Sequence, residues 1–345
     1  MKSAYYLKRI EQMQKRLEGK AYLIEESVDL FYLTGLTLSA GRLLILPEKA
    51  VLFVDGRYIN ACKESSPIPV ELDSISTFQK HLGSLPLFFD PEKMSYARVE
   101  KLRKTHSATP SQNPIKELRL IKDELELHAL QKSADLLYEG FLYLKTELKE
   151  GVSEVELARA FEIFCLKNGA EKLSFDPIIA FGPDSAMPHH RAGSKRLESN
   201  QIVLIDIGVV VDRYCSDMTR VVFFGTVSDE ILELEDVVRR SQEAALALCT
   251  PGTPLGDVDA AARAIMAQSG LEDLYLHTLG HGVGLEIHEY PRLKKGGDDA
   301  ALLLMPGMVV TIEPGLYKAG IGGVRIEDTI VITEEGYQFI TTHDL

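Results

Sequence analysis

Two apolar runs decide the fold of this chain: IVLIDIGVVV at residues 202–211 and YCSDMTRVVFF at residues 214–224. Both runs are rich in the β-branched and aromatic residues that favour strands, and a turn near residues 211–213 separates them. Asp206 lies in the middle of the first run, and Asp217 lies in the second. We predict a β-hairpin that places both carboxylates at neighbouring positions on one face.

The carboxylates of Asp206 and Asp217 would be costly in such a hairpin. Two like charges side by side in an apolar sheet repel each other and lose their hydration. One alternative is that one Asp belongs to a turn and the other caps a helix. Both residues lie inside β-rich runs, however, where no cap is needed. The pattern therefore indicates a bound cation.

The C-terminal part of the chain repeats this arrangement. Glu313 follows the apolar run 308–312, and Glu327 lies in the predicted strand 324–332. The glycine-rich segment 319–323 suits a tight reversal, so a second hairpin would bring a second carboxylate pair together. Two divalent cations would neutralise the four carboxylates. Carboxylate and imidazole ligands suit Mn, Co, Fe or Zn, and the absence of thiolates argues against a closed structural zinc site.

Imidazoles are concentrated in the segment HTLGHGVGLEIH at residues 277–288, which contains His277, His281 and His288. A lone histidine is more often a satisfied structural residue than a ligand. Three histidines interspersed with glycines are not typical of core packing, and glycine lets the backbone approach a ligand closely. A fourth histidine, His189, follows Met187 and Pro188 in a polar loop. We take all four as candidate site residues.

The rest of the chain predicts two domains of mixed structure. Residues 1–115 combine helical patterns at 5–17 and 96–104 with short strands at 21–24, 43–46, 51–54 and 87–89, which indicates a small α/β layer. The polar, proline-bearing segment 107–114 is the predicted linker. Residues 116–345 combine long helices with paired strands, which favours an α+β domain. In this second part, Ser153 and Glu156 form a capping-box pattern.

Composition excludes some classes of protein. The 345 residues include 38 Lys and Arg against 51 Asp and Glu, a net charge of −13, which disfavours binding to nucleic acid or to anionic membranes. The four cysteines have no spacing typical of disulfides or metal sites. The charged N-terminus is unlike a signal peptide, and no uncharged run approaches the length of a membrane span. We expect a soluble cytoplasmic protein.

Five motifs in this order resemble the pita-bread metallopeptidases, and within them the Xaa-Pro aminopeptidases and Xaa-Pro dipeptidases (prolidases). The motifs are IDIG at 205–208, SDMTR at 216–220, GHGVGLEIHE at 280–289, TIEPG at 311–315 and RIEDT at 325–329. The segment FVDGRYINAC at 53–62 is similar to the creatinase-like N-terminal domain of these enzymes. The resemblance implies a pita-bread catalytic domain at 116–345 and a smaller α/β creatinase-like domain at 1–115.

The resemblance also implies a function for each matching residue. The implied ligands of two divalent metal ions, manganese first, with Co, Zn or Fe as alternatives, are Asp206, Asp217, His281, Glu313 and Glu327. Asp217 and Glu327 would bridge the two ions. Glu313 would act as general base, His288 would stabilise the oxyanion, and His189 and His277 would line the substrate site. Tyr317 and Arg325 match residues beside the metals. The implied substrates are proline-containing peptides or dipeptides, and the implied assembly is a homodimer.

Two departures and three alternatives accompany this resemblance. Phe181 stands where the family usually has a small Ser, and Asp184 stands where Asn is common, so both would alter the substrate cleft. Methionine aminopeptidase is one alternative, although the N-terminal domain and the SDMTR and RIEDT motifs argue against it. Creatinase, a metal-free enzyme of the same fold, is another. The third is a non-catalytic pita-bread module that binds proteins, but such relatives usually lack several of the ligands.

Overall fold

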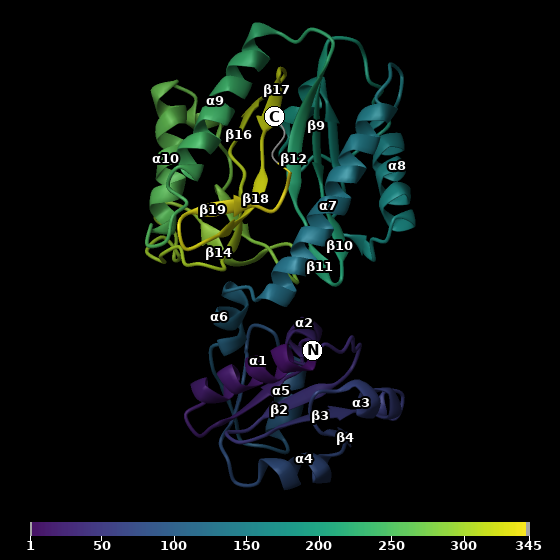
Figure 1. Ribbon diagram of the computed structural model, residues 1–345, viewed down its shortest axis with the longest axis vertical. Helices are drawn as coiled ribbons and strands as arrows, with labels where there is room; N and C mark the ends of the chain where they lie inside the picture. The colour runs from purple at the N-terminus through teal and green to yellow at the C-terminus, as the bar shows by residue number, and fades with distance from the viewer. Residues whose placement is uncertain (1, 343–345) are drawn as a thin grey trace. The chain divides into compact units, whose positions relative to one another are not determined.

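The computed structural model describes residues 2–342 (Figure 1). The chain divides into two compact units, the first ending at Arg119 and the second starting at Leu120. The predicted mixture of helices and strands is confirmed in both units. Within the described range, no helix combines the length and the apolar composition that a bilayer span requires.

The first unit is built on one sheet. Its strands are β1 (Ala21–Ile24), β2 (Arg42–Ile45), β3 (Ala50–Val54), β4 (Val70–Leu72), β5 (Leu87–Phe89) and β6 (Ala108–Pro110). They are ordered β4-β3-β2-β1-β5-β6, with β1, β2 and β3 antiparallel and the outer pairs parallel. The helices are α1 (Lys2–Arg16), α2 (Ser27–Thr34), α3 (Ile59–Ser65), α4 (Ile75–Leu82), α5 (Tyr96–Arg103) and α6 (Pro114–Leu120).

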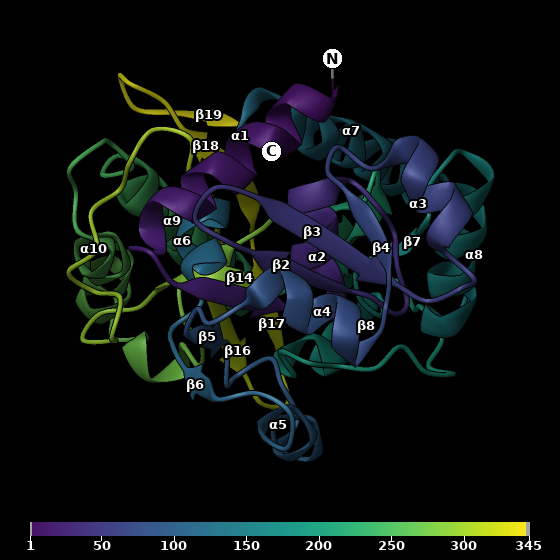
Figure 2. The same ribbon diagram turned by 90° about the horizontal axis from the view of Figure 1, so that it is seen from below.

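The core of this unit follows the alternation of its strands. Leu23 and Phe53 point to the face that packs against Phe78 of α4 and Leu102 of α5. Helix α1 contacts β2, and Figure 2 shows it across the sheet from α4. The segment 107–114 is not simply a linker, because Ala108–Pro110 pairs in parallel with β5. An edge strand tolerates Pro110, whose missing N–H leaves no partner unsatisfied there.

The second unit holds the predicted hairpins. Its strands are β7 (Lys172–Leu173), β8 (Ile178–Phe181), β9 (Gln201–Ile207), β10 (Val209–Val211), β11 (Tyr214–Cys215), β12 (Met218–Phe224), β13 (Gly280–Gly282), β14 (Glu289–Leu293), β15 (Val309–Ile312), β16 (Gly315–Lys318), β17 (Gly322–Arg325), β18 (Asp328–Ile332) and β19 (Tyr337–Phe339). Its helices are α7 (Glu124–Glu147), α8 (Glu154–Lys167), α9 (Asp229–Leu246) and α10 (Leu255–Gln268), with short 3₁₀ turns η1 (Gly182–Ala186) and η2 (Glu272–Leu274).

Helices enclose the strands of this unit from two sides. Figure 1 shows α7 and α8 on one side of the strands and α9 and α10 on the other. The first pair packs on β8, β9 and β12 through a core that includes Phe161, Val203 and Ile205. The second pair packs on strands of the C-terminal part through cores that include Val258 and Ile312. The capping box of Ser153 and Glu156 at the start of α8 is confirmed.

The register of the two halves sets where the acidic residues lie. In the first hairpin, β9 pairs with β12 so that Asp206 faces Thr219, and Asp217 lies at a diagonal position just before β12. In the C-terminal half, β15 pairs with β18 so that Ile312 faces Asp328. Glu327 is not inside one long strand as predicted, because the chain breaks between β17 and β18. An isolated bridge between Thr219 and Glu327 joins the two halves at this break.

Candidate metal centre

Acidic side chains and one imidazole converge where the two hairpins meet. Ligand atoms of Asp217, His281 and Glu327 all lie within 4.8 Å of one another, and all three residues are buried. His281 Nε2 lies 3.6 Å from Asp217 Oδ2 and 3.5 Å from Glu313 Oε1. A group of nitrogen and oxygen donors at these separations can share a divalent cation.

His281 reaches this cluster from β13, which lies between β14 and β15 in the five-stranded sheet. The strand pairs with β15 through Gly282 and Val310, and the backbone N–H of His281 donates to Thr311 Oγ1 over 3.1 Å. His281 Nδ1 lies 3.1 Å from the carbonyl oxygen of Gly282. Because that carbonyl can only accept, Nδ1 carries the proton and Nε2 is left as a lone-pair donor facing the carboxylates.

The electrostatics of the cluster favour a cation over bare charge. Burial, followed by the Glu327 carboxylate, raises the pKa of both Asp217 and Glu313 well above the usual values. Burial, followed by Asp206, raises the pKa of Glu327 to about 8. Burial, followed by His288, lowers the pKa of His281 to about 4, so its imidazole is neutral at pH 7. Neutral imidazole and a group of mutually repelling carboxylates are the forms that a metal binds most tightly.

Asp206 provides the clearest sign of an intended ligand. Its Oδ2 accepts a hydrogen bond from Arg325 Nη2 at 2.5 Å. Its Oδ1 is buried and has no hydrogen-bond partner among the described residues. Leaving a buried carboxylate oxygen unpaired is expensive. The donor set and this unpaired oxygen together fit a bound divalent metal.

A hydrogen-bond chain extends from Asp206 away from the cluster. Arg325 also donates from Nη1 to the Tyr317 hydroxyl at 2.6 Å, and that hydroxyl lies 2.8 Å from His277 Nε2. His277 Nδ1 lies 2.8 Å from the Thr278 carbonyl, so Nδ1 donates there and Nε2 accepts from Tyr317. A side chain at residue 315 would not fit, since a Cβ on Gly315 would lie 2.5 Å from the Tyr317 hydroxyl.

The remaining two predicted histidines lie at the exposed side of the cluster. The His288 ring is exposed, and its centroid lies 4.3 Å from that of His281 in an edge-on arrangement. His189 is exposed in the loop after η1. Burial, followed by Arg292 and then His189, lowers the pKa of His288.

The comparison with known protein families agrees with the metal centre that the geometry indicates. The family described as metallopeptidase family M24 matches residues 128–334, which include every predicted site residue. The chain belongs to metallopeptidase family M24. A second match, to the creatinase/prolidase N-terminal domain, covers residues 7–121. The resemblance predicted from the five motifs is therefore confirmed, and this M24 protein is a metallopeptidase.

Individual relatives span nearly the whole chain. An Xaa-Pro dipeptidase of Pyrococcus horikoshii is 36% identical over 340 residues, covering 97% of this chain and 96% of the relative. The crystal structure of the prolidase from Pyrococcus horikoshii superposes with a TM-score of 0.90 at 35% identity, covering 98% of each chain. The X-Pro aminopeptidase from Thermotoga maritima gives 0.89 at 30% identity, covering 96% of this chain and 98% of that one.

Sequence reasoning missed residues of the M24 site that do not themselves face a metal. Thr219 Oγ1 donates to Glu327 Oε2 at 2.6 Å and accepts from Arg325 Nε at 3.1 Å. Arg220 donates to the Glu327 carbonyl and to Asp328 Oδ1, both at 2.6 Å. These residues belong to the SDMTR and RIEDT motifs, so their place in a motif could have marked them as residues of the site. Nothing in the sequence showed that the two motifs would contact each other.

The two departures from the family pattern do not act alike in this M24 chain. The expectation that Phe181 reshapes the cleft is wrong, because its side chain is fully buried in the core beneath α8. A ring in this place adds apolar packing and does not reach the substrate side. Asp184 forms an ion pair with Lys195 at 3.1 Å. This pairing partly neutralises the charge that Asp184 brings in place of Asn.

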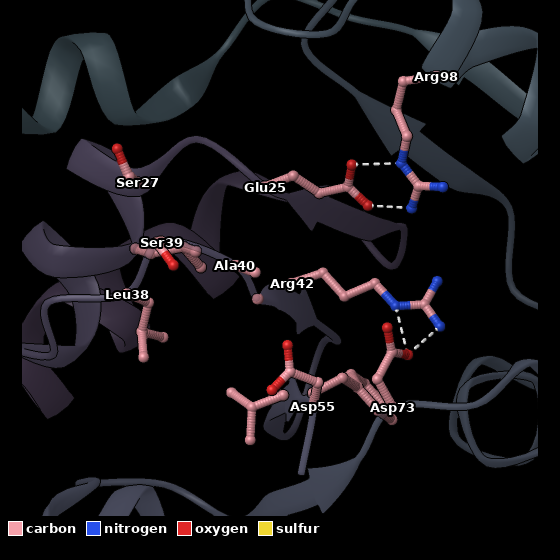
Figure 3. Close-up of a pocket in the computed structure, with 13 residues that line it drawn as sticks. Glu25, Ser27, Leu38, Ser39, Ala40, Arg42, Asp55, Asp73 and Arg98 are labelled. Carbon is pink, nitrogen blue, oxygen red and sulfur yellow. Dashed lines mark hydrogen bonds and ion pairs between the residues drawn. The ribbon is translucent and has the colours of Figure 1, made fainter. Parts of the chain in front are cut away.

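A separate hollow of about 290 Å³ lies in the first unit of the M24 chain (Figure 3). Its charged side chains are paired with one another: Arg42 Nε donates to Asp73 at 2.8 Å, and Arg98 Nε donates to Glu25 at 2.6 Å. Asp55 is held by Arg57 at 2.7 Å. Because these charges satisfy one another, the hollow offers no free ligand group comparable to Asp206 Oδ1.

Proposed function

We propose that this M24 peptidase is a dinuclear-metal exopeptidase that hydrolyses the bond between an N-terminal residue and proline. The buried carboxylate cluster, with the unpaired Oδ1 of Asp206, is the observation that supports the metal centre. The names of the relatives, Xaa-Pro dipeptidase and X-Pro aminopeptidase, support proline as the second residue. No relative reported above favours methionine aminopeptidase or a non-catalytic module.

The proposed ligands are the residues that the two hairpins and β13 bring together: Asp206, Asp217, His281, Glu313 and Glu327. Two divalent ions would balance the charge of the four carboxylates, Asp217 and Glu327 among them. We propose manganese as the metal, since carboxylate-rich sites suit it. When bound, such ions act as Lewis acids and lower the pKa of bound water to about 7.

Glu313 is the proposed general base. Its side chain is 16% exposed, so it is the member of the cluster that a substrate-side proton can reach. Burial, followed by the Glu327 carboxylate, raises its pKa, which strengthens it as a proton acceptor. Glu313 would take a proton from the attacking water and pass it to the leaving nitrogen of proline. The proline nitrogen needs this proton because an unprotonated nitrogen anion is a poor leaving group.

His288, His189 and Tyr317 are the proposed substrate-contacting groups, and His277 supports Tyr317. His288 is exposed beside His281 and would donate a hydrogen bond to the developing oxyanion. His189, on the loop after η1, would orient the substrate. His277 has both ring nitrogens engaged, one by Thr278 and one by Tyr317. Its proposed function is therefore to hold the Tyr317 hydroxyl, with Arg325, beside the metal ligands.

A proline at the second position explains the need for a dedicated site. The X-Pro bond has no N–H, and the proline ring fixes the backbone. Peptidases that hold an extended substrate through that N–H lose the contact. A site that accepts the ring and delivers a proton to its nitrogen does not depend on it. A homodimer stays a prediction from the resemblance, and a cytoplasmic location stays a prediction from composition.

The test is a substrate panel on the manganese-loaded enzyme: Ala-Pro, a longer peptide beginning Ala-Pro, Ala-Ala and a peptide beginning Met-Ala. Cleavage of Ala-Pro is the expected result. Cleavage of the longer peptide after its first residue as well would assign the aminopeptidase type, and its absence the dipeptidase type. A preference for the Met-Ala peptide would overturn the proposal in favour of methionine aminopeptidase.

A further inference from the structure

One buried carboxylate outside the metal centre has no function in the mechanism above. Glu154 is the first residue of α8, and its side chain is only 1% exposed. Its Oε1 accepts a hydrogen bond from the backbone N–H of Phe181 at 3.0 Å. Its Oε2 accepts from the backbone N–H of Gly193 at 2.9 Å and lies 2.8 Å from His190 Nε2. That last contact requires His190 Nε2 to carry a proton.

These partners lie at the two ends of one segment. Phe181 ends β8, and Gly193 comes twelve residues later; we call residues 182–193 the His189 loop. A single carboxylate therefore holds both ends of the loop, and His190 fastens a third point beside His189. All three hydrogen bonds are made to this one buried side chain, so the loss of its acceptor oxygens would leave three donors without their partner.

The same loop reaches the strands of the metal centre. The backbone N–H of Gly323 in β17 donates to Ser185 Oγ at 2.8 Å. Arg325, which also holds Asp206, donates to the Pro188 carbonyl at 3.5 Å. His189 follows directly after Pro188. The loop segment that carries His189 is thus held by contacts to β17 before this residue and by the Glu154 carboxylate after it.

Glu154, Asp184 and His190 also have ligand atoms within 4.8 Å of one another, a spacing that could hold a metal. The contacts around them exclude that use. Both oxygens of Glu154 already accept from N–H donors, and Asp184 is paired with Lys195 Nζ at 3.1 Å. Lys195 Nζ also donates to the Phe181 carbonyl at 2.9 Å. A cation would have to displace a lysine and three hydrogen bonds.

We propose that Glu154 is a positioning residue, which sets the place of the His189 imidazole by holding both ends of the His189 loop. This inference rests on the proposed function, in which His189 orients the substrate. The hydrogen-bond partners of Glu154 are Phe181, His190 and Gly193, and none of these is a proposed metal ligand. A replacement of Glu154 should lower activity only by moving the His189 loop. A residue that merely stabilises the fold would not depend on His189 in this way.

The test is a double-mutant cycle on the metal-loaded enzyme with the dipeptide that the wild type cleaves best. Glu154→Gln keeps the shape but turns an amide group toward N–H donors. It should lower kcat/KM at least about tenfold, because a displacement of about 1 Å near a reaction can cost about a hundredfold. In the His189→Ala background the same change should lower kcat/KM by less than about twofold, since coupled residues are not additive.

Two results would overturn this inference. One is a Glu154→Gln enzyme with wild-type kcat/KM. The other is an equal loss in the two backgrounds, which would mean that Glu154 does not act through His189. If Glu154→Gln does not fold, His190→Ala enters the same cycle, since it removes one donor and leaves both backbone contacts of Glu154. Failure of the proposed function would show instead in the wild type, as no cleavage of Ala-Pro.

Hydrogen exchange gives a second readout that needs no activity. In Glu154→Gln, amides of residues 182–193 should exchange at least about tenfold faster than in the wild type, because their anchoring bonds are lost. Glu156→Gln is the matched control. It makes the same chemical change two residues later, where the carboxylate accepts from the backbone N–H of Ser153 at 2.8 Å and contacts no residue of the loop. Unchanged exchange in Glu154→Gln would contradict the anchoring.

Discussion

Asp206 binds Arg325 through one carboxylate oxygen at 2.5 Å and keeps its other oxygen buried and unpaired among the described residues. The guanidinium holds one oxygen of the carboxylate, and burial, with help from the Asp206 charge, raises the pKa of both Asp217 and Glu327 in the cluster. This geometry is what a metal ligand supported by a second layer of hydrogen bonds should have.

Asp206→Ala and His281→Ala should each abolish hydrolysis by weakening metal binding. Both changes remove a donor from the cluster, and the remaining carboxylates cannot replace it. Metal content after gel filtration, measured by emission spectroscopy, should fall together with activity on Ala-Pro. Full activity in a variant shown to have lost its metal would contradict the metal mechanism.

Metal removal should lower the thermal stability of the wild type. The ions bind only where the cluster is assembled, so they stabilise the folded state by mass action, by about 2.7 kcal/mol when the free metal is at 100 times its Kd. Chelation followed by verified metal analysis should therefore lower Tm, and adding metal back should restore it. An unchanged Tm after complete removal would argue against a metal at the cluster.

The decrease in Tm that metal removal causes should become larger as the pH rises. In the metal-free protein the pKa values of Asp217, Glu313 and Glu327 are raised, the last to about 8. A carboxyl group with a raised folded-state pKa stabilises the fold while protonated, and this contribution is lost as the pH rises through that pKa. The pKa of His281 is lowered to about 4, so this residue changes the stability of the fold with pH only below the unfolded-state pKa of about 6.5. Calorimetry between roughly pH 7 and pH 8.5 should show the difference in Tm between the metal-loaded and the metal-free protein growing with pH. A difference in Tm that stays constant over this range would contradict this account.

His288→Ala should keep the metal and lose turnover. The ring stacks edge-on against His281 but is exposed, so its removal leaves the carboxylate cluster intact. Losing one oxyanion donor typically costs about 100- to 1000-fold in kcat. Metal analysis and steady-state kinetics on the same sample separate the two effects. Loss of metal in this variant would make His288 a ligand instead.

The sequence predicted the first hairpin well because its strands are long and apolar. The run 202–211 is extended and largely buried as expected, but the structure divides it at Gly208 into β9 and β10. The run 214–224 likewise divides into β11 and β12, with Asp217 between them. The spacing of Asp206 and Asp217 still gives their diagonal relation. The strand 324–332 was predicted unbroken, but the structure turns at Glu327 to bridge Thr219, more than one hundred residues earlier. A contact over that separation leaves no local pattern.

Other misses also arise from long-range contacts. The capping-box pattern at Ser153 and Glu156 predicted the start of α8, but it gave no reason to single out Glu154 between them. The partners of Glu154 lie 27 to 39 residues away. Phe181 was placed at the cleft by its position in a motif, whereas the alternation of β8 points its ring into the core.

The most direct test of the central claim is the ratio of kcat/KM for Ala-Pro and Ala-Ala, measured on metal-free enzyme as manganese is added back. We expect no cleavage without metal, and with metal a preference for Ala-Pro of at least about tenfold, since the apolar contact of even one methylene is worth about 1–3 kcal/mol in a pocket. Comparable rates on the two dipeptides would contradict the proline specificity, and full cleavage in the metal-free enzyme would contradict the metal centre itself.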